Sequence, residues 1–231
     1  MSLKNKVAVL AGCTGEIAIS IAQMLLKENA IVIVLAKSSK DLLWIKQKGP
    51  INGDGSILTM LADYSDFYRA EEINADIINR YGKIDLSIAC FEDSPVTKPL
   101  KQVNITEWDR VIEQNISAFF VAARLSFISM KKSRQSMFIS LDFTSHITRA
   151  KGAKLARLSL SMQREMASMF YEETKDTQTK YYHLQVGIKK KKNDAQNNYI
   201  HPDDLGQLIV DLYEGHRKSD DSLFQWMHDT H

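Results

Sequence analysis

The sequence has few cysteines, no large excess of charge of either sign and no long apolar run. Its two cysteines, Cys13 and Cys90, are too few for a disulfide framework. Lys and Arg number 30 against 28 Asp and Glu, and a formal net charge of +2 gives no case for nucleic acid as a partner. No signal segment precedes Lys6, and no apolar run approaches the roughly 20 residues that a membrane helix needs. We therefore expect a cytoplasmic protein that binds neither nucleic acid nor a membrane.

The six histidines show no spacing typical of metal ligands, so no metal site is predicted. What remains is the composition of an ordinary globular protein, with 44% hydrophobic and 25% charged residues. A chain of 231 residues is long enough to bury a full α/β core, and we expect a single domain over residues 1–231.

The N-terminal stretch 6–37 has the pattern of a strand, a helix and a second strand. Val7–Ala11 and Ala30–Leu35 are short apolar runs typical of buried parallel strands. Between them, apolar residues recur at helical spacing from Ile17 up to a stop near Asn29. Such a unit places the helix N-terminus, with its free N–H groups and positive dipole end, above the end of the first strand. The stretch therefore predicts a pyrophosphate site.

The turn after the first strand carries a glycine pattern that supports this prediction. Gly12 can adopt the positive φ needed to leave the strand, and Gly15 lets the backbone approach a ligand closely. Ala18 is small enough for the helix to pack on the sheet. The spacing is a variant of the dinucleotide-binding fingerprint. The alternative is a tight turn that binds nothing.

The end of the second strand indicates which dinucleotide would bind. An acidic residue there would hold the free hydroxyls of the adenosine ribose, whereas a basic residue would accept a 2′-phosphate. The sequence has Lys37 at this place and no carboxylate in the stretch 36–39. This favours NADP over NAD as the cofactor, with a protein that binds neither as the remaining alternative.

Strands and helices continue to alternate along the rest of the chain. Further strands are expected over Ile57–Leu61, Ile84–Cys90 and Ser136–Leu141. Helices are expected over Asp41–Lys48, Tyr68–Tyr81, Leu155–Tyr171, from Thr106 as N-cap to about Ser129, and from His201-Pro202. This order predicts an α/β fold with a Rossmann-like, doubly wound parallel sheet of about seven strands in three α/β/α layers.

Together with this order, several local strings resemble the short-chain dehydrogenase/reductase family, from Lys6 to about Met227. These strings are VAVLAGCTGEIA at the first turn, LADYSD after the third strand, YGKIDLSIA at the fourth, WDRVIEQNISAFFVAAR in the long helix and HPDDLGQLIVDLY near the end. The resemblance implies an oxidoreductase that binds a nicotinamide cofactor and an unidentified small-molecule substrate. It also implies a homodimer or homotetramer built on the helices Thr106–Ser129 and Leu155–Tyr171.

The resemblance assigns roles to particular positions. Asn115 matches an asparagine that helps to hold a catalytic water in the family, and Asp63 matches an aspartate that contacts the adenine. Asp63 could instead cap the following helix, and Asn115 could satisfy backbone groups at a helix kink. The positions that match the family's cofactor site are Gly12, Thr14, Gly15, Glu16, Ile17, Lys37, Asp63, Tyr64 and Ala89.

The catalytic centre departs from the family's pattern. The family uses a tyrosine proton donor whose pKa is lowered by a lysine one helical turn later, and a serine that orients the carbonyl. Alignment on the helix after the fifth strand places Gly152 and Ala156 at the tyrosine and lysine positions. Thr144 and Ser145 are the candidates for the serine. The family's ordinary chemistry is therefore not expected.

Two loops also depart from the pattern. The asparagine-rich string that usually follows the fourth strand is replaced by Ala89-Cys90-Phe91-Glu92. The loop in which the family carries its substrate lid contains the basic run Lys189–Lys192, which is either a solvated loop or a site that attracts an anionic ligand.

These patterns leave hypotheses from different classes open. The first is an oxidoreductase resembling the family that binds NADP(H) with a degenerate centre, in which Asn115 acts with a replacement acid. The candidates for that acid are Thr144, Ser145, Lys151 and Lys154. The second is a catalytically inactive nucleotide-binding or regulatory protein that acts through its oligomer surface. The missing tyrosine favours the second hypothesis on mechanistic grounds.

Overall fold

The fold is known from a computed structural model. It describes residues 2–48, 55–92, 96–130, 135–143, 153–187 and 201–216, and the backbone of 224–226. The sequence predictions for Thr144, Ser145, Lys151, Gly152 and the run Lys189–Lys192 lie outside the described residues.

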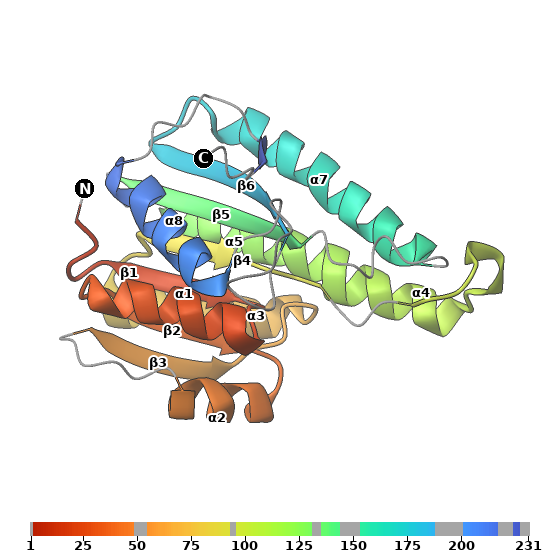
Figure 1. The fold of residues 1–231 in the computed structure, drawn as a ribbon, viewed down its shortest axis with the longest axis horizontal. Coiled ribbons are helices and arrows are strands. Elements are labelled where there is room, and N and C mark those ends of the chain that lie inside the picture. Colours follow the sequence, from red (N-terminus) through yellow and green to blue (C-terminus); the bar gives the residue numbers. More distant parts are fainter. Residues whose placement is uncertain are drawn as a thin grey trace.

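Seven strands form one sheet in the order β3-β2-β1-β4-β5-β6-β7 (Figure 1). The strands are β1 Val7–Ala11, β2 Ile31–Ala36, β3 Ser56–Leu61, β4 Leu86–Ala89, β5 Ser136–Phe143, β6 Thr179–Val186 and the short β7 Phe224–Trp226. All neighbouring pairs are parallel. The strand order reverses between β1 and β4, which is where ligands bind in doubly wound sheets. The predicted Rossmann-like sheet is confirmed.

Helices cover both faces of the sheet, so the three predicted layers are also present (Figure 1). On one face lie α1 (Gly15–Lys27), α2 (Ser39–Lys48) and α8 (Pro202–Glu214). On the other lie α3 (Phe67–Tyr81), α5 (Ala118–Met130) and α7 (Lys154–Thr174). The short 3-10 helix Leu100–Gln102 precedes α4 (Ile105–Val111), which runs through a π-helical turn, Ile112–Ser117, into α5.

The central strands are apolar on both sides because both sides are covered. The sequences VAVLA of β1 and IVIVLA of β2 are buried almost throughout, as expected for parallel strands between two helical layers. On one face α1 packs closely against α8, and a Cβ added at Gly206 would lie 2.7 Å from Cγ of Met24. The glycine therefore permits the close contact that holds α8 against the first βαβ unit.

The ends of several elements differ from the sequence prediction, and others agree. The N-cap of α4 is Asn104 and not Thr106, because the Asn104 side chain accepts the N–H of Glu107 at 2.9 Å while the Glu107 carboxylate accepts the N–H of Asn104. Strand β5 continues past Leu141 to Phe143, since the charge of Asp142 is paired inside the fold. The predicted start of α8 is confirmed, with His201 as its N-cap.

The long helical segment Ile105–Met130 is apolar as well as long. Within the described residues it alone meets the length and composition of a membrane span, with a mean hydropathy of 1.3, and 50% of the apolar window is buried in the fold. Buried core helices meet the same test, so length and composition alone do not indicate a span. Large apolar side chains remain exposed at Phe120 and Ile128 on α5 and at Met169 on α7. The expected homodimer or homotetramer built on these helices stays a prediction.

Candidate functional site

The turn between β1 and α1 is shaped for a close backbone approach. Gly12 and Gly15 have φ values of +72° and +67°, a region that favours glycine. A Cβ added at Gly12 would lie 2.5 Å from the carbonyl oxygen of Cys90 and 2.7 Å from Cε1 of Phe91, whereas one at Gly15 would meet nothing within 4 Å. Thr14 is the N-cap of α1, and its side chain makes no capping hydrogen bond. The first N–H groups of α1 therefore remain available to an anion.

A cavity of about 280 Å³ lies beside this turn, at the carboxyl ends of β1 to β4. Its lining residues are Gly12, Thr14, Ala36, Lys37, Asp41, Ala62, Asp63, Tyr64, Cys90, Phe91, Glu92, Gln114 and Ala118. Of the cofactor residues expected from the sequence, the structure brings Gly12, Thr14, Lys37, Asp63 and Tyr64 together here. The others lie next to it: Gly15, Glu16 and Ile17 form the first turn of α1, and Ala89 is the buried last residue of β4.

A chain of polar contacts runs across the strand ends on one side of the cavity. The Lys37 Nζ donates to Oε1 of Gln114 at 2.6 Å, and the Gln114 Nε2 donates to Oγ of Ser65 at 3.2 Å. Both the N–H and the hydroxyl of Ser65 donate to Oδ1 of Asp63, at 2.9 and 2.7 Å. Lys37 and Asp63 are thus linked through the π-helical turn, a connection that the sequence prediction missed because Gln114 is distant from both in the chain.

Asp63 therefore stabilises a turn rather than a helix. The N-cap of α3 is Asp66, whose side chain accepts the N–H of Arg69. The alternative role considered for Asp63, capping the following helix, thus belongs to Asp66.

The Tyr64 phenol and the Cys90 thiol, which line the cavity, are both uncharged. Burial and the adjacent Cys13 raise the pKa of the Tyr64 phenol, and its ring packs edge-on to that of Phe91 with centroids 5.5 Å apart. A hydrogen bond with Cys13, together with burial, raises the pKa of the Cys90 thiol well above its ordinary value. Both groups consequently stay protonated at neutral pH, so the charges at the cavity come from Lys37 and the carboxylates around it.

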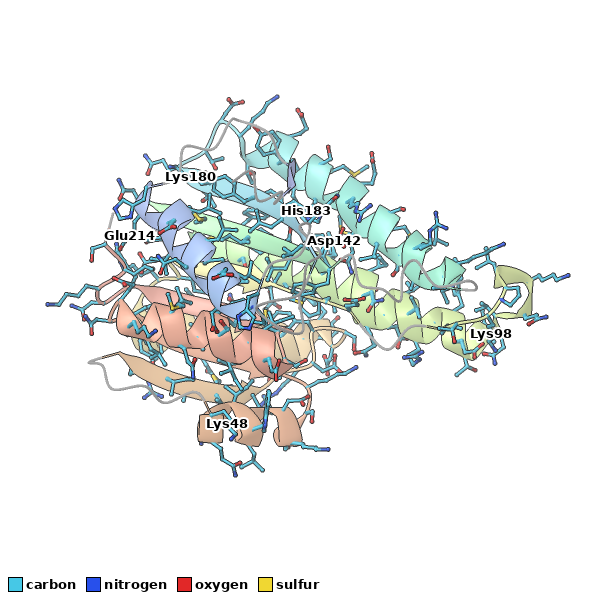
Figure 2. All side chains as sticks on the ribbon, in the orientation of Figure 1. Lys48, Lys98, Asp142, Lys180, His183 and Glu214 are labelled. Carbon is cyan, nitrogen blue, oxygen red and sulfur yellow. The ribbon has the colours of Figure 1, made fainter. Side chains whose placement is uncertain are left out.

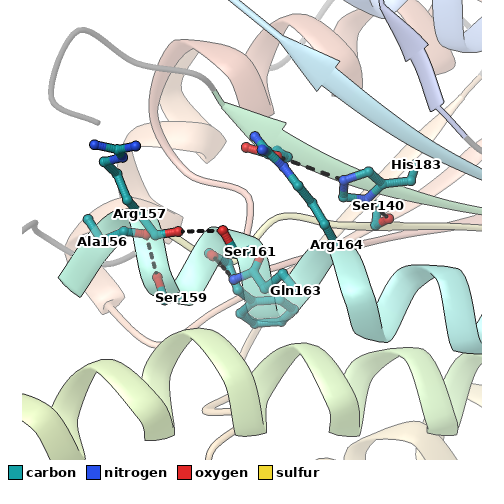
Figure 3. Close-up of polar contacts among 10 residues, drawn as sticks. Ser140, Ala156, Arg157, Ser159, Ser161, Gln163, Arg164 and His183 are labelled. Carbon is teal, nitrogen blue, oxygen red and sulfur yellow. Dashed lines mark hydrogen bonds and ion pairs between the residues drawn. The ribbon is translucent and has the colours of Figure 1, made fainter. Parts of the chain in front are cut away.

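Asn115 lies in the π-helical turn and faces α7. Its Nδ2 donates to Oγ of Ser159 at 3.3 Å, and its backbone carbonyl accepts Nε2 of Gln163 at 3.1 Å. The same Gln163 Nε2 donates to the carbonyl of Phe91 at 2.8 Å. The α7 residues that make these contacts with Asn115 are Ser159 and Gln163, one helical turn apart (Figure 3). The role of Asn115 as a catalytic residue stays a prediction.

A buried charged cluster lies next to these contacts, where β5 and β6 pass under α7. Oδ2 of Asp142 accepts Nε of Arg164 at 2.5 Å and lies 3.8 Å from Nε2 of His183. The other ring nitrogen of His183, Nδ1, lies 2.7 Å from Oγ of Ser140. Asp142 and His183 are each 1% exposed. Figure 2 places these two side chains near each other, and Figure 3 shows Arg164 reaching from α7 toward them.

Sequence reasoning missed this cluster. The prediction ended the strand at Leu141 and so left Asp142 in a loop, and no motif singles out Arg164 or His183. The available signal was an acidic residue within an otherwise apolar run, which requires a basic partner elsewhere if the run is a buried strand.

A comparison with protein families matches residues 6–146 to the family described as short chain dehydrogenase. Among curated proteins, the chain is 26% identical over 179 residues to the 3-oxoacyl-(acyl-carrier-protein) reductase FabG of Salmonella typhimurium, covering 73% of this chain and 70% of that protein. It is equally similar to the protein of the same name from Escherichia coli, with the same identity and coverage.

Solved structures share the fold over almost the whole chain. A metagenomic short-chain oxidoreductase in complex with NADP superposes with a TM-score of 0.78 at 19% identity, covering 97% of this chain and 96% of that one. An alcohol dehydrogenase from Thermococcus sibiricus complexed with 5-hydroxy-NADP gives 0.77 at 18% identity, with 98% of each chain covered. An NADH-dependent reductase complexed with NAD gives 0.74 at 16% identity, covering 94% of this chain and 93% of that one.

Proposed function

Because the chain belongs to the short-chain dehydrogenase family, we propose that it binds NADP(H) at the carboxyl ends of β1 to β4 without catalysing the family's hydride transfer. The observation that carries the proposal is the contrast between the two ends of the site. The glycine turn borders a cavity, whereas beside Asn115 the amide of Gln163 donates to the backbone carbonyls of both Phe91 and Asn115.

The first half of the proposal rests on the turn and the helix behind it. The positive φ of Gly12 and the free N–H groups of α1 suit a phosphate, and the macrodipole of α1 favours negative charge at the same point. The Lys37 ammonium at the end of β2 lies where a ribose 2′-phosphate would be held, and its bond to the neutral amide of Gln114 leaves its charge intact. NADP is therefore favoured over NAD.

Replacement of Lys37 by alanine is expected to weaken NADPH binding about tenfold and to change NADH binding less than about twofold, because only NADPH carries the 2′-phosphate that the ammonium would contact. Isothermal titration of the unsubstituted protein and of Lys37→Ala with NADPH and with NADH measures the four dissociation constants. Lys40→Ala, an exposed lysine of α2 outside the cavity lining, is the matched control and should change neither. Equal losses of affinity for NADPH and NADH in Lys37→Ala would contradict the proposal that Lys37 contacts the 2′-phosphate.

The second half of the proposal rests on the groups that face Asn115. A bound nicotinamide supplies or accepts the hydride, and the protein must supply or accept a proton at the substrate oxygen. The hydroxyl of Ser159 and the amide of Gln163 are poor general acids near neutral pH, and each is already engaged in hydrogen bonds inside the fold. They cannot take the place of a tyrosine and lysine pair.

The protein is consequently expected not to oxidise NADPH with a 3-oxoacyl thioester, the substrate class in the name of its Salmonella relative. The decrease of NADPH absorbance should match the rate without protein, and the Salmonella reductase, assayed in parallel, serves as the positive control. Turnover that disappears in the Asn115→Ala variant would contradict the proposal and would restore Asn115, Thr144 and Ser145 as catalytic candidates.

A further inference from the structure

The described residues that line the cavity lie on one side of the crevice. In this fold a dinucleotide lies across the point where the strand order reverses, with one nucleotide on each side. The described lining residues come from the ends of β1, β2, β3 and β4, from α2, and from the π-helical turn and the start of α5. In the part of the chain that the structure describes, no lining residue comes from β5, β6 or α7. The cavity therefore covers the adenosine side.

Phe91 follows β4 and lies at the crossing point, which is the place between β1 and β4 where the strand order reverses and the two sides of the crevice meet. Its ring atoms Cε1 and Cδ1 lie 2.7 and 2.8 Å from the position of a Cβ on Gly12, so the ring rests directly on the glycine turn. The ring also packs edge-on to Tyr64, and its backbone carbonyl is fixed by the Gln163 amide at 2.8 Å. A pyrophosphate that continued from the turn toward β4 would meet this ring.

Beyond Phe91, paired side chains fill the described part of the second side. Gln163 is 3% exposed and ties the loop after β4 to the π-helical turn. Asp142, Arg164 and His183 form the cluster beneath α7, with Ser140 bonded to His183. Opening this side for a nicotinamide would break several buried hydrogen bonds and separate a buried ion pair, and each such loss is costly.

We infer that the ligand of this cavity is a phosphorylated adenosine mononucleotide, equivalent to the adenosine half of NADP, and that a nicotinamide half gains no binding energy here. The inference rests on the proposed nucleotide site and narrows its ligand. A volume of about 280 Å³ lies just below the range of roughly 300–1,000 Å³ for ligand pockets. One phosphate would lie at the turn from Gly12 to Gly15, and the other at Lys37.

The test compares adenosine 2′,5′-bisphosphate with NADPH by isothermal titration of the full chain. The two dissociation constants are expected to agree within about fivefold, or the bisphosphate to bind more tightly. NADPH that binds more than about fivefold tighter would overturn this inference and leave the proposed function standing. If neither ligand binds, the proposed function fails together with the inference.

A Phe91→Ala variant tests the barrier itself. Removing the ring is expected to improve NADPH binding about tenfold relative to the bisphosphate, because only the dinucleotide must pass the crossing point. Phe91→Leu, which keeps most of the bulk, is the control. It should leave the ratio of the NADPH and bisphosphate dissociation constants near that of the unsubstituted protein. The dissociation constants of NADPH and the bisphosphate are measured on the same preparation of each variant. A loss of folded protein therefore affects both constants equally and cancels in their ratio. An unchanged ratio in Phe91→Ala would overturn the role of the ring.

Discussion

The Asp142→Ala variant is expected to unfold with a free energy about 3 kcal/mol lower than the unsubstituted protein. The Asp142 side chain is fully buried and accepts a hydrogen bond from the guanidinium of Arg164, so its removal leaves a positive charge without its partner between α7 and the sheet. Removing one partner of a buried pair typically costs about 3–5 kcal/mol. The Arg164 side chain keeps 32% of its exposure and can turn toward water, which sets the expected loss at the lower end. Equilibrium unfolding in urea measures it.

The matched control removes both charges. The double variant Asp142→Leu with Arg164→Met should recover most of the stability lost in Asp142→Ala, since apolar residues of similar size often replace a buried ion pair without loss. Asp142→Asn, which keeps the shape and an accepting oxygen, should lie between the two. A loss below about 1 kcal/mol in Asp142→Ala would contradict the buried pair and place Asp142 in contact with water.

The Gly12→Ala variant is expected to lose about 3 kcal/mol of stability and to bind NADPH at least about tenfold more weakly. Its Cβ would clash with the backbone carbonyl of Cys90, which cannot move without displacing the end of β4, and with the ring of Phe91. The positive φ adds a strain of about 1–2 kcal/mol for a non-glycine residue. The displaced turn would also distort the contact surface for the phosphate.

Gly15→Ala separates these contributions. Gly15 has nearly the same φ, at +67° against +72°, but its Cβ would have no neighbour within 4 Å. This variant should therefore lose only the strain of about 1–2 kcal/mol. Urea unfolding of both variants measures the difference, and equal losses would contradict the close approach of Gly12 to the loop after β4.

The fold could be predicted because its signals are local. The apolar runs of β1 and β2 lie in a sheet covered on both faces, and such strands are recognisable without knowledge of their neighbours. The glycines of the first turn were likewise predictable, since a strand that turns at once into a helix requires positive φ at Gly12. The same local signals located the start of α8 at Pro202.

The site could be predicted only in part because its decisive contacts are distant in sequence. Gln163 donates to carbonyls 72 and 48 residues earlier in the chain, and nothing in the helical pattern of α7 indicates either contact. The burial of Asp142 depends on Arg164, which reaches it only after α7 has packed on the sheet. A sequence alignment assigns residues to the tyrosine and lysine positions of the family, but it cannot show which α7 side chains contact Asn115.

Isothermal titration with NADPH, paired with the melting temperature in its presence, is the most direct test of whether the glycine turn and Lys37 form a nucleotide site. The structure leads us to expect a micromolar dissociation constant, weaker binding of NADH, and a melting temperature that rises with NADPH concentration because the ligand binds the folded state. No heat with either cofactor, together with an unchanged melting temperature, would contradict the nucleotide site.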